Sequence, residues 1–195
     1  MGNPNKKNGF LPQLAAAGRV VPATMAICCL LYSLLILGIG QVVTPYTANG
    51  SLIRNGKGAI IGSESLAQGF SHPEYLWPRP SAVNYNAAAS GGSNWSPANP
   101  KLRARAEVII AKLGATGEKR VPADLVTASG SGLDPQITLK AAEFQVRRIA
   151  AARGLPVAAV MKLLNKFAKR TGGPLAPEPL VNVLLVNMAL EQLVK

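Results

Sequence analysis

The chain has 195 residues, of which 21 are basic and nine acidic, so its formal net charge is +12. Only 15% of the residues are charged while 48% are hydrophobic, which excludes a chain that is disordered throughout. Aromatic residues make up 5%, too few for a base-stacking nucleic-acid surface, and a single histidine (His72) with two adjacent cysteines (Cys28, Cys29) leaves little for a zinc site, a disulfide framework or a Ser-His-Asp triad.

The first predicted element is a membrane-spanning helix over residues 20–43, a stretch without any charged residue. A helix of this length covers roughly 36 Å, enough to cross a hydrocarbon core of about 30 Å. A cleaved signal peptide would have an apolar region of only about 7–15 residues, and Tyr46 makes the following cleavage site a poor one. We therefore predict an uncleaved helix, with Pro22 in its first turn.

The charges that flank this span predict its orientation. Residues 1–19 contain three basic residues and residues 44–62 contain two. This excess places a short basic segment, 1–19, in the cytoplasm and the rest of the chain, 44–195, in the periplasm. Residues 44–195 are numerous enough to bury a core of their own.

Residues 44–195 are predicted to form a soluble α+β (α/β-like) domain, with short strands first and about four helices later. Residues 51–61 predict a β-hairpin that turns at 54–57. A loop over 78–100 contains one charge, Arg79, and an ordered loop of this length is usually functional. The four helices are predicted at 100–113 after the cap Asn99, at 139–153 between Thr138 and Gly154, from Pro156 to Gly172-Gly173, and at 181–194 after Pro179.

The motifs predict neither catalysis nor a metal site. Residues 90–94 (SGGSN) lack the lysine of a phosphate-binding P-loop, and Pro135 stands where a dinucleotide-binding fingerprint needs its third glycine. Asp124 and Asp134 bracket a serine-glycine stretch and could hold a cation. Two carboxylates alone provide few of the oxygen ligands that calcium or magnesium requires, however, so a role in turns and caps is favoured.

Two groups of residues predict contacts with lipid or with another helix. Four basic residues are predicted on one side of the third helix, either as a solvated face or in contact with anionic lipid headgroups: Lys162, Lys166, Lys169 and Arg170. Four small residues in the span fall near one helical face, where a partner helix could approach closely: Ala26, Cys29, Ser33 and Gly40. Nucleic acid is a poor candidate partner, because an exported domain would not meet it.

Nine short motifs follow one another along most of the chain: 49–51 (NGS), 62–63 (GS), 68–70 (QGF), 75–82 (YLWPRPSA), 85–86 (YN), 89–94 (ASGGSN), 121–135 (VPADLVTASGSGLDP), 145–150 (QVRRIA) and 181–184 (VNVL). In this order they resemble the C subunit of the bacterial Kdp-type high-affinity potassium-transporting P-type ATPase, from the span to the C-terminus. Gln136 and Thr138-Leu139 depart from the family's usual His and Ser-Pro, which affects a local helix start.

The resemblance implies a non-catalytic, single-pass subunit of a bacterial inner-membrane potassium pump. The implied partners are a channel-like potassium-translocating subunit and a P-type subunit that hydrolyses ATP. The family is described as a catalytic chaperone that raises the ATP affinity of the hydrolysing subunit, through a transient complex that includes ATP, and that stabilises the assembly. The sequence has no recognisable nucleotide motif, so ATP would be bound only through that complex.

A periplasmic domain cannot touch cytoplasmic ATP, so an effect on ATP affinity would have to pass through packed helices. We expect the domain to cap the potassium entrance of the channel-like subunit with its uncharged 78–100 loop. The candidate residues for contact with a subunit or ligand are Tyr85, Asn86, Ser90, Gly91, Gly92, Ser93 and Asn94. A separate set of site candidates comes from the loop that carries the family motif: Asp124, Thr127, Ser129, Ser131 and Asp134. Two alternatives are a membrane-anchored extracytoplasmic enzyme and a lipid- or polyanion-binding module.

Overall fold

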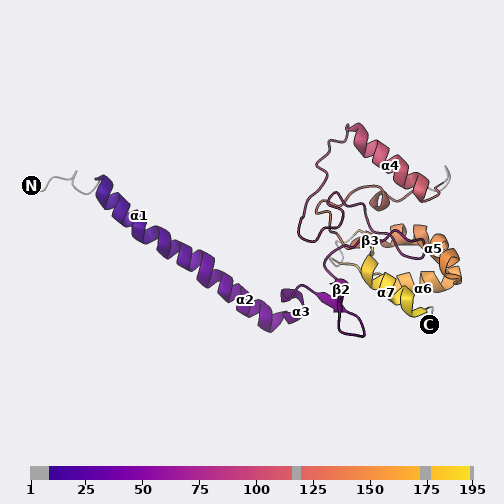
Figure 1. Cartoon of the computed structure of the whole chain (residues 1–195), viewed down its shortest axis with the longest axis horizontal. Coiled ribbons are helices and arrows are strands. Elements are labelled where there is room, and N and C mark those ends of the chain that lie inside the picture. The colour runs from indigo at the N-terminus through magenta and orange to yellow at the C-terminus, as the bar shows by residue number, and fades with distance from the viewer. Residues whose placement is uncertain (1–8, 116–119, 172–176, 194–195) are drawn as a thin grey trace, which may run out of the picture. The chain divides into compact units, whose positions relative to one another are not determined.

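The computed structural model describes residues 9–115, 120–171 and 177–193, and it divides the chain into two compact units, 1–51 and 52–195. Figure 1 shows a long helix in the first unit and a group of short strands and helices in the second. This composition confirms the predicted fold class, one apolar N-terminal helix followed by a mixed α/β region.

The helix of the first unit runs from Phe10 to Val43 without a break. It comprises α1 (Phe10–Met25), a π-helical segment η2 (Ala26–Leu31) and α2 (Tyr32–Val43), and the short helix α3 (Pro45–Ala48) follows. Its large apolar side chains are exposed, which fits a helix whose surroundings are lipid rather than water. The helix begins ten residues before the predicted span, so which part lies in the bilayer stays a prediction.

Pro22 lies inside α1, so its predicted place in a first turn was wrong. The prediction took Val20 as the start of the helix, but residues 10–19, whose only charge is Arg19, continue the helix toward the N-terminus. The Thr24 hydroxyl donates to the carbonyl oxygens of Val20 and Val21, both at 2.9 Å. Pro22 lacks the N–H group that would bond within the helix, and the Thr24 hydroxyl bonds to two backbone carbonyls one turn before it. The π-helical segment starts two residues after Thr24, where these two features disturb the regular backbone hydrogen bonds.

The second unit begins with the predicted hairpin. β1 (Leu52–Arg54) pairs antiparallel with β2 (Ile60–Ser63). The Asn55 carboxamide oxygen accepts from the N–H groups of Lys57 and Ala59, both at 3.0 Å, and Gly58 has a φ of +80°. The turn thus covers 55–59, slightly longer than the predicted turn, and the hairpin itself is confirmed.

Two helices begin at their predicted residues because their N-terminal caps are local. α4 (Pro100–Lys112) begins after Asn99, whose side chain accepts from a backbone N–H at 2.9 Å. After a short 3-10 turn, η3 (Ala123–Leu125), α5 (Leu139–Arg153) begins after Thr138, which accepts from a backbone N–H at 3.2 Å. Gly154, with φ +63°, ends α5 in the left-handed conformation that favours glycine.

A second antiparallel pair lies among the helices, where the sequence predicted none. β3 (Gln136–Thr138) pairs with β4 (Leu180–Asn182), so the fourth helix, α7 (Val183–Leu193), begins at Val183. α6 (Val157–Phe167) also ends before its predicted stop, because Lys169 and Leu180 exchange two backbone hydrogen bonds of 2.9 Å and draw the chain into an extended path. The predicted stop, Gly172-Gly173, lies outside the described residues.

The core of the second unit is formed by α5, α6 and α7 together with β3 and β4 (Figure 1). Its larger fully buried apolar residues are Leu76, Ile137, Val146, Ile149, Val160, Leu164, Val181, Val186 and Leu190. Leu76 comes from the long segment before α4, so this segment is fixed to the helical core. That attachment positions the site described next.

Candidate functional site

Residues 75–80 lie in an extended path, and buried amide side chains hold their backbone in place of a neighbouring strand. The Leu76 N–H donates to Asn187 at 2.7 Å, and the Asn187 amide donates back to the Leu76 carbonyl at 3.0 Å. Gln145 makes the same exchange with Trp77, at 2.9 and 3.1 Å. Because an amide side chain is both donor and acceptor, Asn187 from α7 and Gln145 from α5 each satisfy both backbone polar groups of one residue.

Arg148 adds a charged support from α5. One guanidinium nitrogen donates to the carbonyl oxygens of Pro73 and Tyr75, and the other donates to Gln145 at 2.6 Å. The guanidinium carbon lies 3.7 Å from the centre of the Trp77 ring. Burial lowers the pKa of Arg148 to about 10, which still leaves it charged at neutral pH.

Arg153, at the end of α5, connects this segment to the end of α7. Its guanidinium donates to the Glu74 carbonyl at 2.7 Å and to the Leu190 carbonyl at 3.2 Å. It also pairs with the Glu191 carboxylate at 2.7 Å. A hydrogen bond to Glu191, with a smaller contribution from burial, raises the pKa of the Tyr75 phenol nearby. The four side chains from α5 and α7 therefore immobilise residues 73–77.

Beyond Pro80, two loops pack against each other, and we call them the serine-glycine loops: residues 81–94 and 127–134. The Gly91 N–H donates to the Ser131 carbonyl at 2.8 Å, and the Ser90 hydroxyl donates to the same oxygen at 3.2 Å. The Ser129 N–H donates to the Pro80 carbonyl at 3.1 Å. The structure thus brings the loop of predicted contact residues together with the loop that carries the family motif.

Glycine is needed where these loops meet. A β-carbon on Gly92 would lie 2.9 Å from the Gly130 carbonyl oxygen. A β-carbon on Gly132 would lie 2.7 Å from the Gly91 carbonyl oxygen and from a methyl group of Val83, and Gly132 has a φ of +70°. Side chains at these positions would separate the loops.

The hydroxyl groups of the second loop bond to their own backbone. Ser129 and Ser131 each accept from an N–H group two or three residues ahead, at 3.1 Å. The Thr127 hydroxyl donates to the carbonyl oxygen four residues before it, at 2.7 Å. These side chains fold the loop and so have an architectural role in this structure.

The two aspartates also bond within the protein. Asp134 accepts from a backbone N–H two residues ahead at 3.0 Å, and its other oxygen pairs with Arg79 at 3.1 Å. Asp124 accepts from the Thr138 N–H at 2.8 Å. Asp134 thus has the turn role that the sequence favoured, whereas Asp124 makes a long-range contact, to a backbone group fourteen residues ahead. The described residues contain no group of three His, Cys, Asp or Glu side chains that could hold a metal.

The predicted contact residues of the first loop divide into an inner and an outer set. Tyr85 points inward, its hydroxyl donates to the Arg79 carbonyl at 2.8 Å, and burial raises the pKa of its phenol. Asn86, Ser90 and Asn94 are exposed, and residues 86–90 form a continuous exposed edge without a charge. The second loop contacts the end of this edge, where the Ser90 hydroxyl donates to the Ser131 carbonyl.

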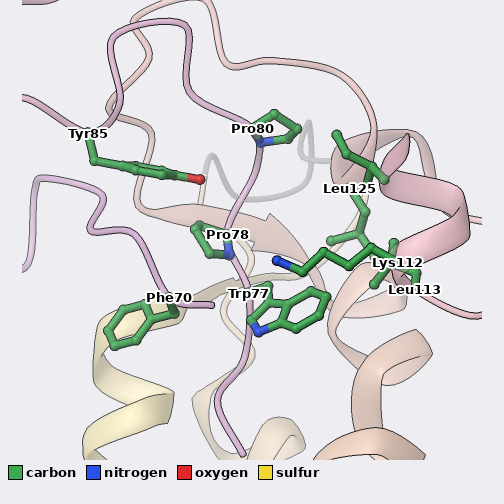
Figure 2. Close-up of a pocket in the computed structure, with 9 residues that line it drawn as sticks. Phe70, Trp77, Pro78, Pro80, Tyr85, Lys112, Leu113 and Leu125 are labelled. Atoms are coloured by element: carbon green, nitrogen blue, oxygen red, sulfur yellow. The ribbon is translucent and has the colours of Figure 1, made fainter. Parts of the chain in front are cut away.

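A cavity of about 150 Å³ adjoins the first loop (Figure 2). It is lined by Phe70, Trp77, Pro78, Pro80, Tyr85, Ile109, Lys112, Leu113 and Leu125. The Lys112 ammonium, from the end of α4, lies 4.6 Å from the centre of the Trp77 ring. Lys112 is the one charged residue of the lining, and the Tyr85 hydroxyl, which also belongs to it, donates to the Arg79 carbonyl.

Comparison with known proteins decides the family. Residues 14–192 match the family described as K+-transporting ATPase, c chain. This chain belongs to the KdpC family. It is 49% identical to the potassium-transporting ATPase KdpC subunit of Parvibaculum lavamentivorans, over 91% of this chain and 95% of the relative. Identity to the KdpC subunits of Herpetosiphon aurantiacus and Geobacter sulfurreducens is 46% and 44%, covering 94% and 86% of this chain and 96% and 90% of the relatives.

As a KdpC family member the chain is a subunit of a potassium-transporting ATPase complex, and it therefore has partner subunits. Its apolar N-terminal helix fits a single-pass membrane protein. The resemblance inferred from the motifs is confirmed by these matches over most of the chain.

The small residues predicted to form a packing face divide between two kinds of helix in this KdpC chain. Ala26 and Cys29 lie in the π-helical segment, whereas Ser33 and Gly40 lie in α2. Ser33 and Gly40, seven residues apart in a regular α-helix, lie on nearly the same side of α2. Because a π-helix has more residues per turn than an α-helix, the seven residues from Ala26 to Ser33 do not return to that side. Contact of this face with a partner helix stays a prediction.

The basic residues predicted to face lipid are exposed, but only two of them lie on the third helix. Lys162 and Lys166 are on α6, while Lys169 and Arg170 follow its end at Phe167. Placing all four on one helix was wrong, because the pairing of Lys169 with Leu180 ends α6 early. Lipid contact by these residues stays a prediction.

Sequence reasoning missed the residues that hold 73–77. Gln145 and Asn187 are polar residues on the buried faces of α5 and α7, with exposed fractions of 1% and 2%. A polar residue on an apolar helical face is the signal that could have found them, because buried amides must have partners. Arg148 and Arg153 gave no such signal, since their helix positions alone do not show what they contact.

Proposed function

We propose that this KdpC chain acts by binding rather than by chemistry of its own. The observation that supports this proposal is that polar side chains of the serine-glycine loops form hydrogen bonds with the protein's own backbone. The side chains of Ser129, Ser131 and Asp134 accept from backbone N–H groups near them in sequence, and the first loop presents an uncharged exposed edge at 86–90 and 94. Such an arrangement suits a rigid surface that contacts a partner protein.

The partner that fits this edge is the channel-like potassium-translocating subunit, at its potassium entrance. An edge without charge neither repels potassium nor binds it tightly, which is what a cap at an ion entrance requires. The three basic residues before the predicted span, residues 20–43, support a cytoplasmic N-terminus and a periplasmic second unit. The helix would anchor the chain in the assembly.

The P-type ATPase subunit is the second proposed partner, and the chain raises the ATP affinity of that subunit as a catalytic chaperone. With the second unit in the periplasm, this effect passes through membrane helices and is a coupling of about 1–3 kcal/mol. ATP is then bound by the complex, and no nucleotide motif of this chain is required.

The test is to place a charge on the exposed edge. Ala88→Arg changes an exposed residue of the edge, and Ala98→Arg changes an exposed residue of the same segment outside it. We expect Ala88→Arg to weaken co-purification with the potassium-translocating subunit and to reduce potassium uptake, while Ala98→Arg leaves both unchanged. The same comparison is made with Asn94→Arg, provided its thermal unfolding matches the unmodified chain. Normal assembly and uptake with both edge variants would refute the proposal.

A further inference from the structure

The β1–β2 hairpin has a fixed base. A β-carbon on Gly62 would lie 2.8 Å from a methyl group of Leu184, so the strand is in close contact with α7. Ser63 is 6% exposed, and the Asn182 amide donates to the Glu64 carbonyl at 2.8 Å. The base therefore belongs to the folded second unit.

The tip of the hairpin is ordered although it is exposed. Every residue from 54 to 61 is exposed, and Figure 1 shows the loop before β2 extending away from the helices of its unit. The Arg54 guanidinium donates to the Gly58 carbonyl at 2.9 Å, and the Gly58 N–H donates to the Asn55 carbonyl at 2.9 Å. With the two bonds accepted by the Asn55 side chain, these contacts fix the shape of a tip that no described residue covers.

The exposed surface of the hairpin combines apolar and basic side chains. Ile60 is 54% exposed, Leu52 41% and Ile61 37%. Arg54 and Lys57 are the only charged residues between 44 and 63, so no acidic group neutralises them within this stretch. Apolar side chains beside cations are typical of surfaces that enter the headgroup region of an anionic bilayer.

The covalent chain keeps the hairpin near the end of the apolar helix. Eight residues, 44–51, join Val43 to β1, and even a fully extended segment of that length spans at most about 28 Å. Four of the eight form the helical turn α3, which shortens this reach. If the helix crosses the bilayer, the hairpin is therefore held close to the bilayer surface, whichever side it lies on.

We propose that the β1–β2 hairpin is a second membrane contact of this chain, in which Ile60 and Ile61 insert among the lipid headgroups while Arg54 and Lys57 face lipid phosphates. The occupant is the bilayer surface rather than a partner protein, because the exposed tip carries two cations without an acidic residue between 44 and 63, and only eight residues of chain separate β1 from the apolar helix. This inference uses the membrane helix but is independent of the potassium-entrance proposal.

The test measures whether lipid reaches the hairpin. In the full chain carrying Cys28→Ala and Cys29→Ala, a single cysteine is introduced as Ile60→Cys and labelled with an environment-sensitive dye. Ala152→Cys, at an exposed position of α5, is the control. The labelled chains are reconstituted, alone and with their partner subunits, into vesicles of phosphatidylglycerol and phosphatidylcholine that carry a headgroup spin label. We expect a shift of emission to shorter wavelength and a loss of intensity at position 60, and neither at position 152.

A second variant tests the cations. Lys57→Glu should reduce the quenching at position 60 in vesicles with phosphatidylglycerol and leave it unchanged in pure phosphatidylcholine. Equal quenching at positions 60 and 152 would overturn the proposal, as would no quenching at position 60 in either preparation. Quenching at position 60 that disappears when the partner subunits are present would also overturn it, because a protein surface would then cover the hairpin. None of these outcomes depends on potassium uptake, so the two proposals fail separately.

Discussion

At the scale of single residues, Gly132 offers the sharpest test of how the serine-glycine loops meet. Gly132→Ala would strain a backbone with φ +70° and place a methyl group 2.7 Å from the Gly91 carbonyl oxygen. We expect a loss of about 1–3 kcal/mol in the free energy of unfolding, measured by chemical denaturation of the full chain in detergent. Gly130→Ala is the matched control, because a β-carbon there meets nothing within 4 Å. A similar loss for both variants would show that the loop contact has no special need of glycine at 132.

Gln145 gives a second test at this scale, aimed at the segment with Trp77. Gln145→Leu keeps the side chain's size but leaves the Trp77 N–H and carbonyl groups without their amide partner. Each buried group left unpaired costs about 1–3 kcal/mol, so thermal unfolding should occur at a clearly lower temperature. Asn165→Leu, on the exposed side of α6, serves as the control and should change stability little. An unchanged unfolding temperature for Gln145→Leu would mean that the amide is not what holds this segment.

At the scale of elements, the sequence predicted what local residues decide. The hairpin, α4 and α5 were predicted because Asn55, Asn99 and Thr138 act within a few residues of themselves. The β3–β4 pair and the end of α6 were not, since they depend on backbone pairing between segments far apart, such as Lys169 with Leu180. The contact between the two serine-glycine loops was not predicted for the same reason, because it joins segments far apart in the sequence. The loops themselves could be identified from their motifs.

The start of α5 can be tested through its cap. Thr138→Ala removes the hydroxyl that accepts from the helix, and the free energy of unfolding should fall by about 1 kcal/mol. Thr138→Ser keeps the hydroxyl and should lose less. Chemical denaturation of the two variants in parallel checks this order. Equal losses would assign the effect to the methyl group and to its packing.

The membrane helix can be tested through its small residues. Ser33→Leu would fill the line shared with Gly40, whereas Gly38→Leu changes a residue about 140° away around α2. If a partner helix packs against this line, Ser33→Leu should weaken association by about 1 kcal/mol, roughly fivefold, and Gly38→Leu should not. Co-purification of the partner subunits in mild detergent measures the difference. Equal yields from both variants would remove this face from the assembly interface.

At the scale of the whole molecule, the two units have different physical requirements. The apolar helix is exposed throughout and needs lipid or other helices around it, whereas the second unit buries a core of its own. A subunit built this way can anchor an assembly with one part and contact a partner with the other. Whether that contact acts on potassium or on ATP depends on the side of the membrane that the second unit occupies.

The sidedness of the serine-glycine loops therefore separates the two mechanisms. In the full chain with Cys28→Ala and Cys29→Ala, Ser93→Cys adds one thiol to the first loop, and a membrane-impermeant thiol reagent is applied to spheroplasts before and after permeabilisation. Because three basic residues precede the predicted span, residues 20–43, we expect labelling in intact spheroplasts. That result would exclude direct contact of the loops with cytoplasmic ATP and leave capping and coupling through the helix. Labelling only after permeabilisation would reverse the topology, and the loops would then be candidates for stabilising nucleotide on the ATPase subunit directly.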